Sequence, residues 1–300
     1  MKASPEMYRF RLSGLFFVLL TLAAVALPGP ARQAHAQGGF GDITITPTRI
    51  VLEGRDRSGT ILLANTGAKK ATYRISVVNM RMSETGAFEE IPEGSALPGE
   101  QFAEDLVRFA PRQVTLDPGA SQTVRIALRK PAGLAAGEYR SHLVIRAIPD
   151  GSAGRSIEQK SGEGVAISLS VIPGVALPVI VRHGELSAKA TLSDFLYDPA
   201  PMTGDDGRAS LTFNINREGN RSVYGDIAAT YFAPGSDEGV LLSEVNQLAV
   251  YTPIDRRIVK MMLAIPQGLE LHSGGRIAVT YRTPPKEGGK VIGAGEYRIP

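Results

Sequence analysis

Hydrophobic and polar residues alternate along most of this chain with a period of two, which is typical of half-buried β-strands. The alternation is clear in the segments 43–46, 60–65, 72–78, 113–116, 124–128, 175–181, 211–215, 226–232, 246–251, 259–265 and 276–281. No segment has a convincing helical period; 241–250 comes nearest, and we expect a strand there as well. Short strands separated by Gly- and Pro-bearing turns predict an all-β fold made of sandwiches.

The spacing of the strands predicts two immunoglobulin-like β-sandwich domains in tandem. We expect an N-terminal domain over 37–182 and a C-terminal β-sandwich domain over 183–300, with the hinge near Arg182. Residues 81–105 are less regular and read as a long connection with room for a short strand. The polar, Gly- and Ser-rich segment 150–164 reads as a flexible loop.

The order of residues from 113 onward is the most specific pattern in the chain. Alternation over 113–116 is followed by the dipeptide Pro118-Gly119 and by renewed alternation over 124–128. This pattern predicts two antiparallel strands joined as a hairpin, with a further strand from Tyr139.

The N-terminus has the three parts of a secretory signal peptide. A basic start is followed by a largely apolar run of 13 residues over 15–27 and by the cleavage motif Ala34-His35-Ala36. The run is shorter than the ~20 residues needed to span a bilayer. We therefore expect residues 1–36 to be removed, and a mature chain without an integral membrane segment.

Composition argues against several kinds of chemistry. The chain has no cysteine, and its formal net charge of +3 is not gathered into a basic stripe, so we expect neither a thiolate metal site nor nucleic-acid binding. The histidines of the mature chain lack metal-ligand spacing, and His142 lies in a predicted strand, where a structural role is expected. No nucleophile elbow, phosphate-binding loop or dinucleotide fingerprint is present, so we assign no catalytic residue, no cofactor and no metal.

The central pattern also resembles the first domain of the periplasmic pilus-assembly chaperones, the PapD-like family. The matching residues are Pro111, Leu116, Pro118, Gly119, Gln122, Val124 and Arg125, followed by Arg146, Ile148 and Pro149. A second match consists of Thr48, Arg49 and Gly54. The resemblance covers residues 41–182, and for 183–300 it rests on size and β-pattern alone.

The resemblance implies a role for Arg49. In this family the corresponding arginine binds the C-terminal carboxylate of a pilus subunit, for which a planar, permanently charged guanidinium is well suited. The family's partner lysine is absent, because Ala176 stands at that position and no lysine occurs between Lys160 and Lys189. Arg182 is a further candidate for the second cation.

An uncharged segment supplies a candidate donor strand. Val165, Ile167, Leu169 and Val171 alternate with small residues, and no charge occurs over 165–172. An edge strand of this kind is a template for another chain, because its backbone hydrogen-bonds to the partner while every second side chain enters the partner's pockets. Natural edge strands are usually protected by Lys or Pro.

Together these features predict a periplasmic chaperone that binds secreted pilus-type subunits by strand addition, and the resemblance adds an outer-membrane usher as a second partner. One alternative is a structural or adhesive exported protein that is itself a component of a surface assembly. Another is an exported hydrolase or sugar-binding domain, for which a clustered acidic or histidine pocket would be the sign.

Overall fold

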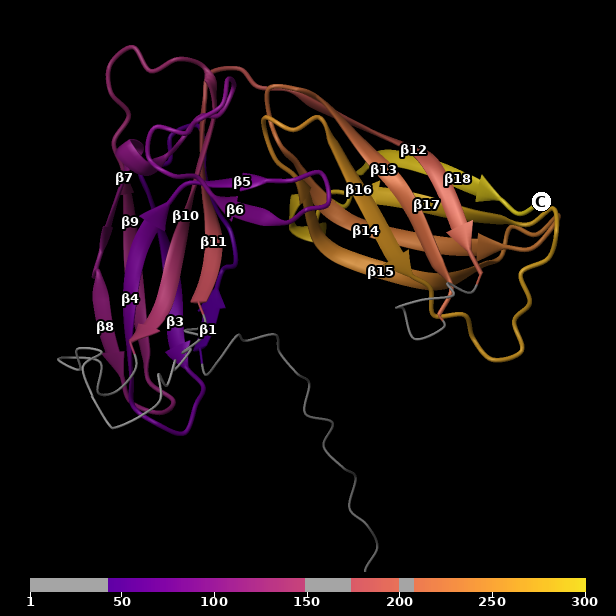
Figure 1. The fold of residues 1–300 in the computed structure, drawn as a ribbon, viewed down its shortest axis with the longest axis horizontal. Helices are drawn as coiled ribbons and strands as arrows, with labels where there is room; N and C mark the ends of the chain where they lie inside the picture. The colour runs from indigo at the N-terminus through magenta and orange to yellow at the C-terminus, as the bar shows by residue number, and fades with distance from the viewer. Residues whose placement is uncertain (1–42, 149–173, 200–207) are drawn as a thin grey trace, which may run out of the picture. The chain divides into compact units, whose positions relative to one another are not determined.

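The computed structural model describes residues 43–148, 174–199 and 208–300. The expected signal peptide, residues 1–36, lies outside the described residues, as do 150–164 and the four candidate donor residues Val165, Ile167, Leu169 and Val171. The described chain is all-β and forms two immunoglobulin-like sandwiches in tandem, each with its own hydrophobic core (Figure 1). Within it, no helix has the length and apolar character needed to cross a membrane.

The first sandwich consists of two sheets. One has the order β1-β3-β9-β7, with β1 (Ile43–Thr46), β3 (Ser58–Asn65), β9 (Ser121–Leu128) and β7 (Val107–Ala110). The other has the order β2-β11-β10-β4-β8, with β2 (Ile50–Leu52), β11 (Gly174–His183), β10 (Gly137–Ile148), β4 (Ala71–Val78) and β8 (Gln113–Leu116). All pairs are antiparallel except β2 with β11, which is parallel.

Alternation determines which side chains fill this core. In β9 the buried residues are Val124, Ile126 and Leu128, whose neighbours in the strand are exposed. Because successive side chains of a strand point to opposite faces, these three meet the inward residues of the facing sheet. The first core is therefore an apolar layer between the two sheets, as the sequence pattern predicts.

The hairpin predicted around Pro118-Gly119 is wrong. Strand β8 pairs with β4 in one sheet, whereas β9 pairs with β3 and β7 in the other. The Pro118-Gly119 turn therefore carries the chain from one layer of the sandwich to the other. Alternation and a tight turn are equally compatible with both arrangements, because each strand needs only one buried face.

The second sandwich has a three-stranded sheet facing a four-stranded sheet. The first sheet has the order β12-β13-β16, with β12 (Ala188–Asp198), β13 (Ser210–Gly219) and β16 (Arg256–Met262). The second has the order β15-β14-β17-β18, with β15 (Gly239–Val250), β14 (Val223–Phe232), β17 (Arg276–Arg282) and β18 (Val291–Arg298). The segment 241–250 is thus a strand, as expected, and the largest fully buried side chains of this core include Tyr231, Tyr281 and Phe213.

The irregular connection 81–105 contains more structure than the sequence suggested. Its first part forms a hairpin of β5 (Met80–Met82) and β6 (Phe88–Glu90), and its last part is the single 3-10 turn η1 (Glu104–Leu106). The tip of the hairpin contacts β16 of the second sandwich: Ile258 donates its backbone N–H to the Glu84 carbonyl at 2.7 Å. Arg256 Nη2 also lies 2.6 Å from a Glu84 carboxylate oxygen.

Asn65, at the end of β3, holds two turns of the first sandwich together. It is fully buried, and its Nδ2 donates to the carbonyl oxygens of Lys69 at 2.8 Å and Leu116 at 3.0 Å. Its Oδ1 accepts from the Gly67 N–H at 3.0 Å, and its carbonyl accepts from the Gly119 N–H at 2.9 Å. The side chain thereby links the end of β3 to the crossing between the two sheets.

We predict that Asn65→Ala destabilises the first sandwich by about 2–4 kcal/mol, since the buried Leu116 carbonyl and the half-buried Gly67 N–H lose their partner at about 1–3 kcal/mol each. Chemical denaturation followed by circular dichroism measures the change. Gln122→Ala is the matched control, because that exposed amide donates only to the carbonyl of its neighbour Thr123, at 3.0 Å. Equal stabilities of the two variants would contradict the role given to Asn65.

Candidate functional site

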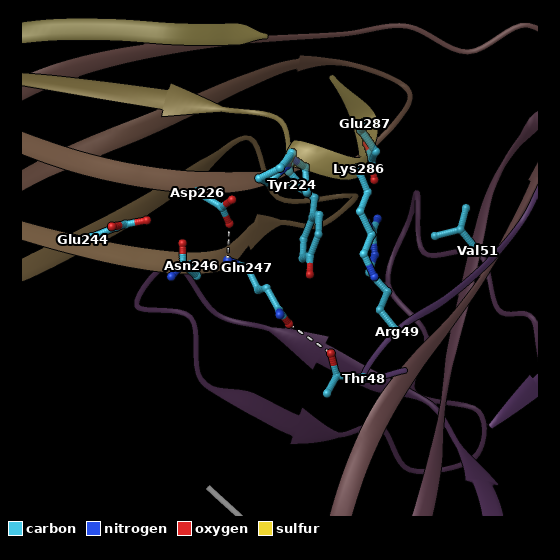
Figure 2. Close-up of a pocket in the computed structure, with 12 residues that line it drawn as sticks. Thr48, Arg49, Val51, Tyr224, Asp226, Glu244, Asn246, Gln247, Lys286 and Glu287 are labelled. Carbon is cyan, nitrogen blue, oxygen red and sulfur yellow. Dashed lines mark hydrogen bonds between the residues drawn. The ribbon is translucent and has the colours of Figure 1, made fainter. Parts of the chain in front are cut away.

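A pocket of about 730 Å³ in the described chain is lined by both sandwiches (Figure 2). The first sandwich contributes Thr48, Arg49 and Val51, from the segment that joins β1 to β2 and from β2 itself. The second contributes β14, the end of β15 and the connection between β17 and β18, with Tyr224, Asp226, Glu244, Asn246, Gln247, Pro284, Pro285, Lys286 and Glu287. The sequence-predicted residue Arg49 therefore lies in a pocket, although Arg182 and Ala176 do not line it.

Arg49 is held in place by an aromatic ring and lacks polar partners. Its guanidinium carbon lies 4.0 Å from the centre of the Tyr224 ring, a cation–π contact that fixes the plane of the group. Its Nε and Nη2 are buried and have no hydrogen-bond partner within the described chain. Burial raises the pKa of Tyr224 although the Arg49 charge opposes the shift, so this ring stays neutral. A buried guanidinium with free donors is suited to bind an anion.

A strained backbone forms another wall of the pocket. Gln247, a residue with a side chain, has φ of 61°, in the left-handed region that such residues seldom adopt. It lies beside an irregularity in the β14–β15 pairing, where its N–H donates to Asp226 Oδ1 at 2.9 Å. Thr48 Oγ1 donates to Gln247 Oε1 at 2.9 Å across the two sandwiches, as Figure 2 shows. Strain of this kind is common at binding sites, where the surrounding structure maintains it.

A second, smaller pocket of about 260 Å³ lies on the other side of Gln247 and is largely aromatic and apolar. Phe88 from the β5–β6 hairpin stacks edge-on against His142, with ring centres 5.1 Å apart, and also approaches Tyr251. Both ring nitrogens of His142 are buried without a partner in the described residues. Burial, and secondarily the nearby Arg140 charge, lower the pKa of His142 to about 3, so the ring is neutral near pH 7.

Arg182 is bound to carboxylates outside both pockets. Its Nε donates to Glu138 at 3.0 Å and its Nη1 donates to Glu53 at 2.9 Å. Burial acts to lower the pKa of Arg182, but the two carboxylates outweigh it and the pKa is raised. The structure thus does not bring Arg182 to Arg49.

Ala176 stands where the resemblance in sequence would place a lysine, and its surroundings supply no cation in its stead among the residues that line its pocket except Arg257. Ala176 is exposed and lines the smaller pocket, beside Pro178. The lysine that lines the Arg49 pocket is Lys286, from the 3-10 turn η2 (Pro285–Glu287) of the second sandwich. Sequence reasoning missed Lys286, because no motif marks it and only the fold brings it near Arg49.

Strand β11, which follows the candidate donor segment in the chain, has an open edge. On one side it pairs with β10 from Gly174 to His183, but on the other β2 pairs only with the three residues from Val179 to Val181. Over 174–178 that second edge meets no strand among the described residues. A strand edge of this kind presents unpaired backbone groups.

Nothing in the described segments points to metal chemistry: no group of three or more His, Cys, Asp or Glu side chains is placed to hold an ion. The polar groups of the Arg49 pocket are two cations, carboxylates, amides and two hydroxyls. This set suits recognition of a charged ligand by ion pairing and hydrogen bonding.

Comparison with known proteins gives structural matches only. No family model matches the chain, and no curated protein matches its sequence. It is similar to the YadV chaperone, with 13% identity and a TM-score of 0.41 over 86% of this chain and 100% of that one. The Pseudomonas aeruginosa CupB2 chaperone is 11% identical, with a TM-score of 0.40 over 85% of this chain and 100% of that one. A chain in the structure of the Salmonella enterica SafA pilin in complex with the SafB chaperone is 11% identical, with a TM-score of 0.37 over 87% of this chain and 98% of that one.

Acid should destabilise the protein through His142. Its pKa in the fold, about 3, is below its ordinary value of 6.5, so on acidification the unfolded chain binds the proton first. The contribution of His142 to the free energy of unfolding is fully present above pH 6.5 and is lost as the pH falls toward 3. The free energy of unfolding then falls by at most about 1.4 kcal/mol per pH unit through this group.

His142→Leu should therefore flatten the fall in unfolding free energy with decreasing pH, measured by urea denaturation at several pH values in this range. His272→Leu is the control, because it removes an exposed histidine that lies outside the pocket of His142. If both variants keep the wild-type slope, His142 does not titrate in this way.

Proposed function

We propose that this protein is a periplasmic chaperone that binds pilus- or fimbrial-type subunits, completes their fold with an edge strand and delivers them for assembly at the cell surface. Export by a signal peptide over residues 1–36 and two domains over 37–182 and 183–300 belong to the same proposal. An outer-membrane usher would be the acceptor of the bound subunit. No enzymatic step and no cofactor are part of this function.

The unpartnered guanidinium of Arg49 is the observation that carries the proposal. Its Nε and Nη2 are buried without a partner in the described chain, and the residue lines a pocket of about 730 Å³. A buried polar group without a hydrogen bond costs about 1–3 kcal/mol, and more where it is charged. A carboxylate would accept two parallel hydrogen bonds from the group and remove this cost. The C-terminus of a subunit offers such a carboxylate.

The open edge of β11 supports strand addition. Val175, Leu177, Val179 and Val181 all contact the first core, so the odd-numbered residues of β11 share the inward face. The candidate donor residues Val165, Ile167, Leu169 and Val171 are also odd-numbered. We propose that on binding the strand extends toward the N-terminus with the same parity. The subunit would then pair with the backbone of this segment and take its odd side chains into its own core.

We predict that Arg49→Gln lowers subunit capture by about tenfold or more, as expected for loss of a bidentate charged hydrogen bond. Stability should change by no more than about 1 kcal/mol, because loss of the cation–π contact with Tyr224 is opposed by removal of the unpartnered buried donors. Co-purification of one subunit, identified by mass spectrometry, measures capture, and thermal unfolding measures stability. Arg182→Gln is the contrasting variant, since its ion pairs with Glu138 and Glu53 make it mainly a stability residue. An Arg49→Gln protein that captures the subunit at full strength would show that Arg49 is not the anchor.

The donor segment is tested separately by Ile167→Asp and Leu169→Asp. Each buried aliphatic side chain is worth about 1.5–3 kcal/mol, and a carboxylate in its place would be unpaired in the groove of the subunit. Both variants should lose capture while the free protein unfolds at its usual temperature, and Ser168→Asp, of opposite parity, should keep capture. A folded Ile167→Asp variant that captures as well as wild type would contradict strand donation.

A further inference from the structure

Arg49 forms no ion pair with the carboxylates that line its pocket, Asp226, Glu244 and Glu287. No ion pair joins it to a carboxylate of the described residues, and its two buried nitrogens have no acceptor. Asp226, the carboxylate on the neighbouring strand, uses Oδ1 to accept the Gln247 N–H at 2.9 Å. The positive charge of Arg49 is therefore available to a ligand.

Lys286 brings a second positive charge to the same pocket from the other sandwich. Figure 2 shows Lys286 and Arg49 at one end of the pocket, with Glu244 at the opposite end. Lys286 is exposed, and no ion pair or hydrogen bond joins its ammonium group to the rest of the described chain. Its neighbour Glu287 also lines the pocket, and this carboxylate partly offsets the positive charges of Arg49 and Lys286.

The loop that carries Lys286 is well ordered by its own bonds. Pro284 and Pro285 restrict φ at the entry, and Gly288, with φ of 98°, donates its N–H to the Pro285 carbonyl at 3.0 Å. At its base the Thr283 N–H donates to the Lys290 carbonyl at 2.8 Å, and the Lys290 N–H returns to Thr283 Oγ1 at 2.9 Å. A lysine on such a loop loses little backbone freedom when it meets an anion.

We propose that Lys286 is the second cation of the carboxylate site, so that one ligand carboxylate is held by Arg49 of the first sandwich and Lys286 of the second. This inference rests on the proposed function, and it adds a residue that is distant in sequence from the candidate donor segment. Arg49 supplies the directional, bidentate contact, and the flexible ammonium of Lys286 supplies charge at the pocket mouth. A bound carboxylate then also ties the two sandwiches together.

The test uses the full mature protein and a capped tetrapeptide, N-acetyl-Val-Thr-Val-Val, with either a free C-terminal carboxylate or a C-terminal amide. Binding is followed by chemical-shift titration, and the measured quantity is the ratio of the two dissociation constants. Wild type should prefer the carboxylate by about tenfold or more, and Lys286→Gln should lower this preference by about threefold or more, the size expected for one exposed charge pair. Lys290→Gln removes the same charge from the same loop but not from the pocket, so it should leave the preference unchanged. Lys286→Arg should retain the wild-type preference for the carboxylate peptide.

Salt separates a charge role of Lys286 from a merely structural one. Because an exposed charge is screened more strongly than a half-buried one, the preference of wild type should fall between about 50 mM and about 500 mM salt, and that of Lys286→Gln should fall less. If Lys286→Gln matches Lys290→Gln in preference and salt response while Arg49→Gln abolishes the preference, Lys286 is not part of the site and the Arg49 anchor stands. If wild type shows no preference for the carboxylate, both the anchor and this inference are overturned.

Discussion

The arrangement of the site depends on one buried carboxylate, that of Glu138, where the two sandwiches meet. Its side chain has no solvent exposure, and its Oε2 accepts from Arg182 Nε at 3.0 Å. Its Oε1 accepts from the backbone N–H of Ser222 at 3.2 Å and from the Ser222 hydroxyl. Taking a charge out of water costs several kcal/mol unless its partners are well placed, so this contact tolerates little displacement. Ser222 directly precedes β14, which carries Tyr224, and the carboxylate thereby ties the start of β14 to β10.

Strain and unpaired groups also gather at the two pockets. The end of β15 lines both of them, and Gln247 adopts φ of 61° there. Thr48 and Asp226 hold Gln247 in this conformation through hydrogen bonds of 2.9 Å each. The free energy gained in the two well-packed cores offsets the strain at Gln247 and the unpartnered donors of Arg49. This distribution is what a binding site requires, because a site that satisfied all its own groups would have no free energy to offer a ligand.

The sequence was sufficient for some of these features and insufficient for others, for physical reasons. Alternation determines which face of a strand is buried, so the strands and both cores were predictable from residues such as Val124 and Ile126. It does not determine which sheet a strand joins, and this is why the hairpin at Pro118-Gly119 was predicted wrongly. The local match around Arg49 pointed to a residue that does lie in a pocket. The carboxylates that occupy Arg182, and the presence of Lys286 in the pocket, arise from contacts between distant segments that no local pattern records.

The open edge of β11 raises the question of how the free protein avoids pairing with itself. Pro178 lies within the strand and has no N–H, so the edge loses one donor just before β2 covers it at Val179. Beyond Gly174 toward the N-terminus, the apolar odd-numbered residues have no charged neighbour until Glu163. Proteins usually protect such an edge with charge. Over the described residues 174–178, Pro178 is the one protective residue on the open edge. Under the proposed function, an anchor beside such an edge would select among extended chains. A chain whose carboxylate reached Arg49 would gain both contacts, whereas an internal segment of any other protein would gain only the backbone pairing.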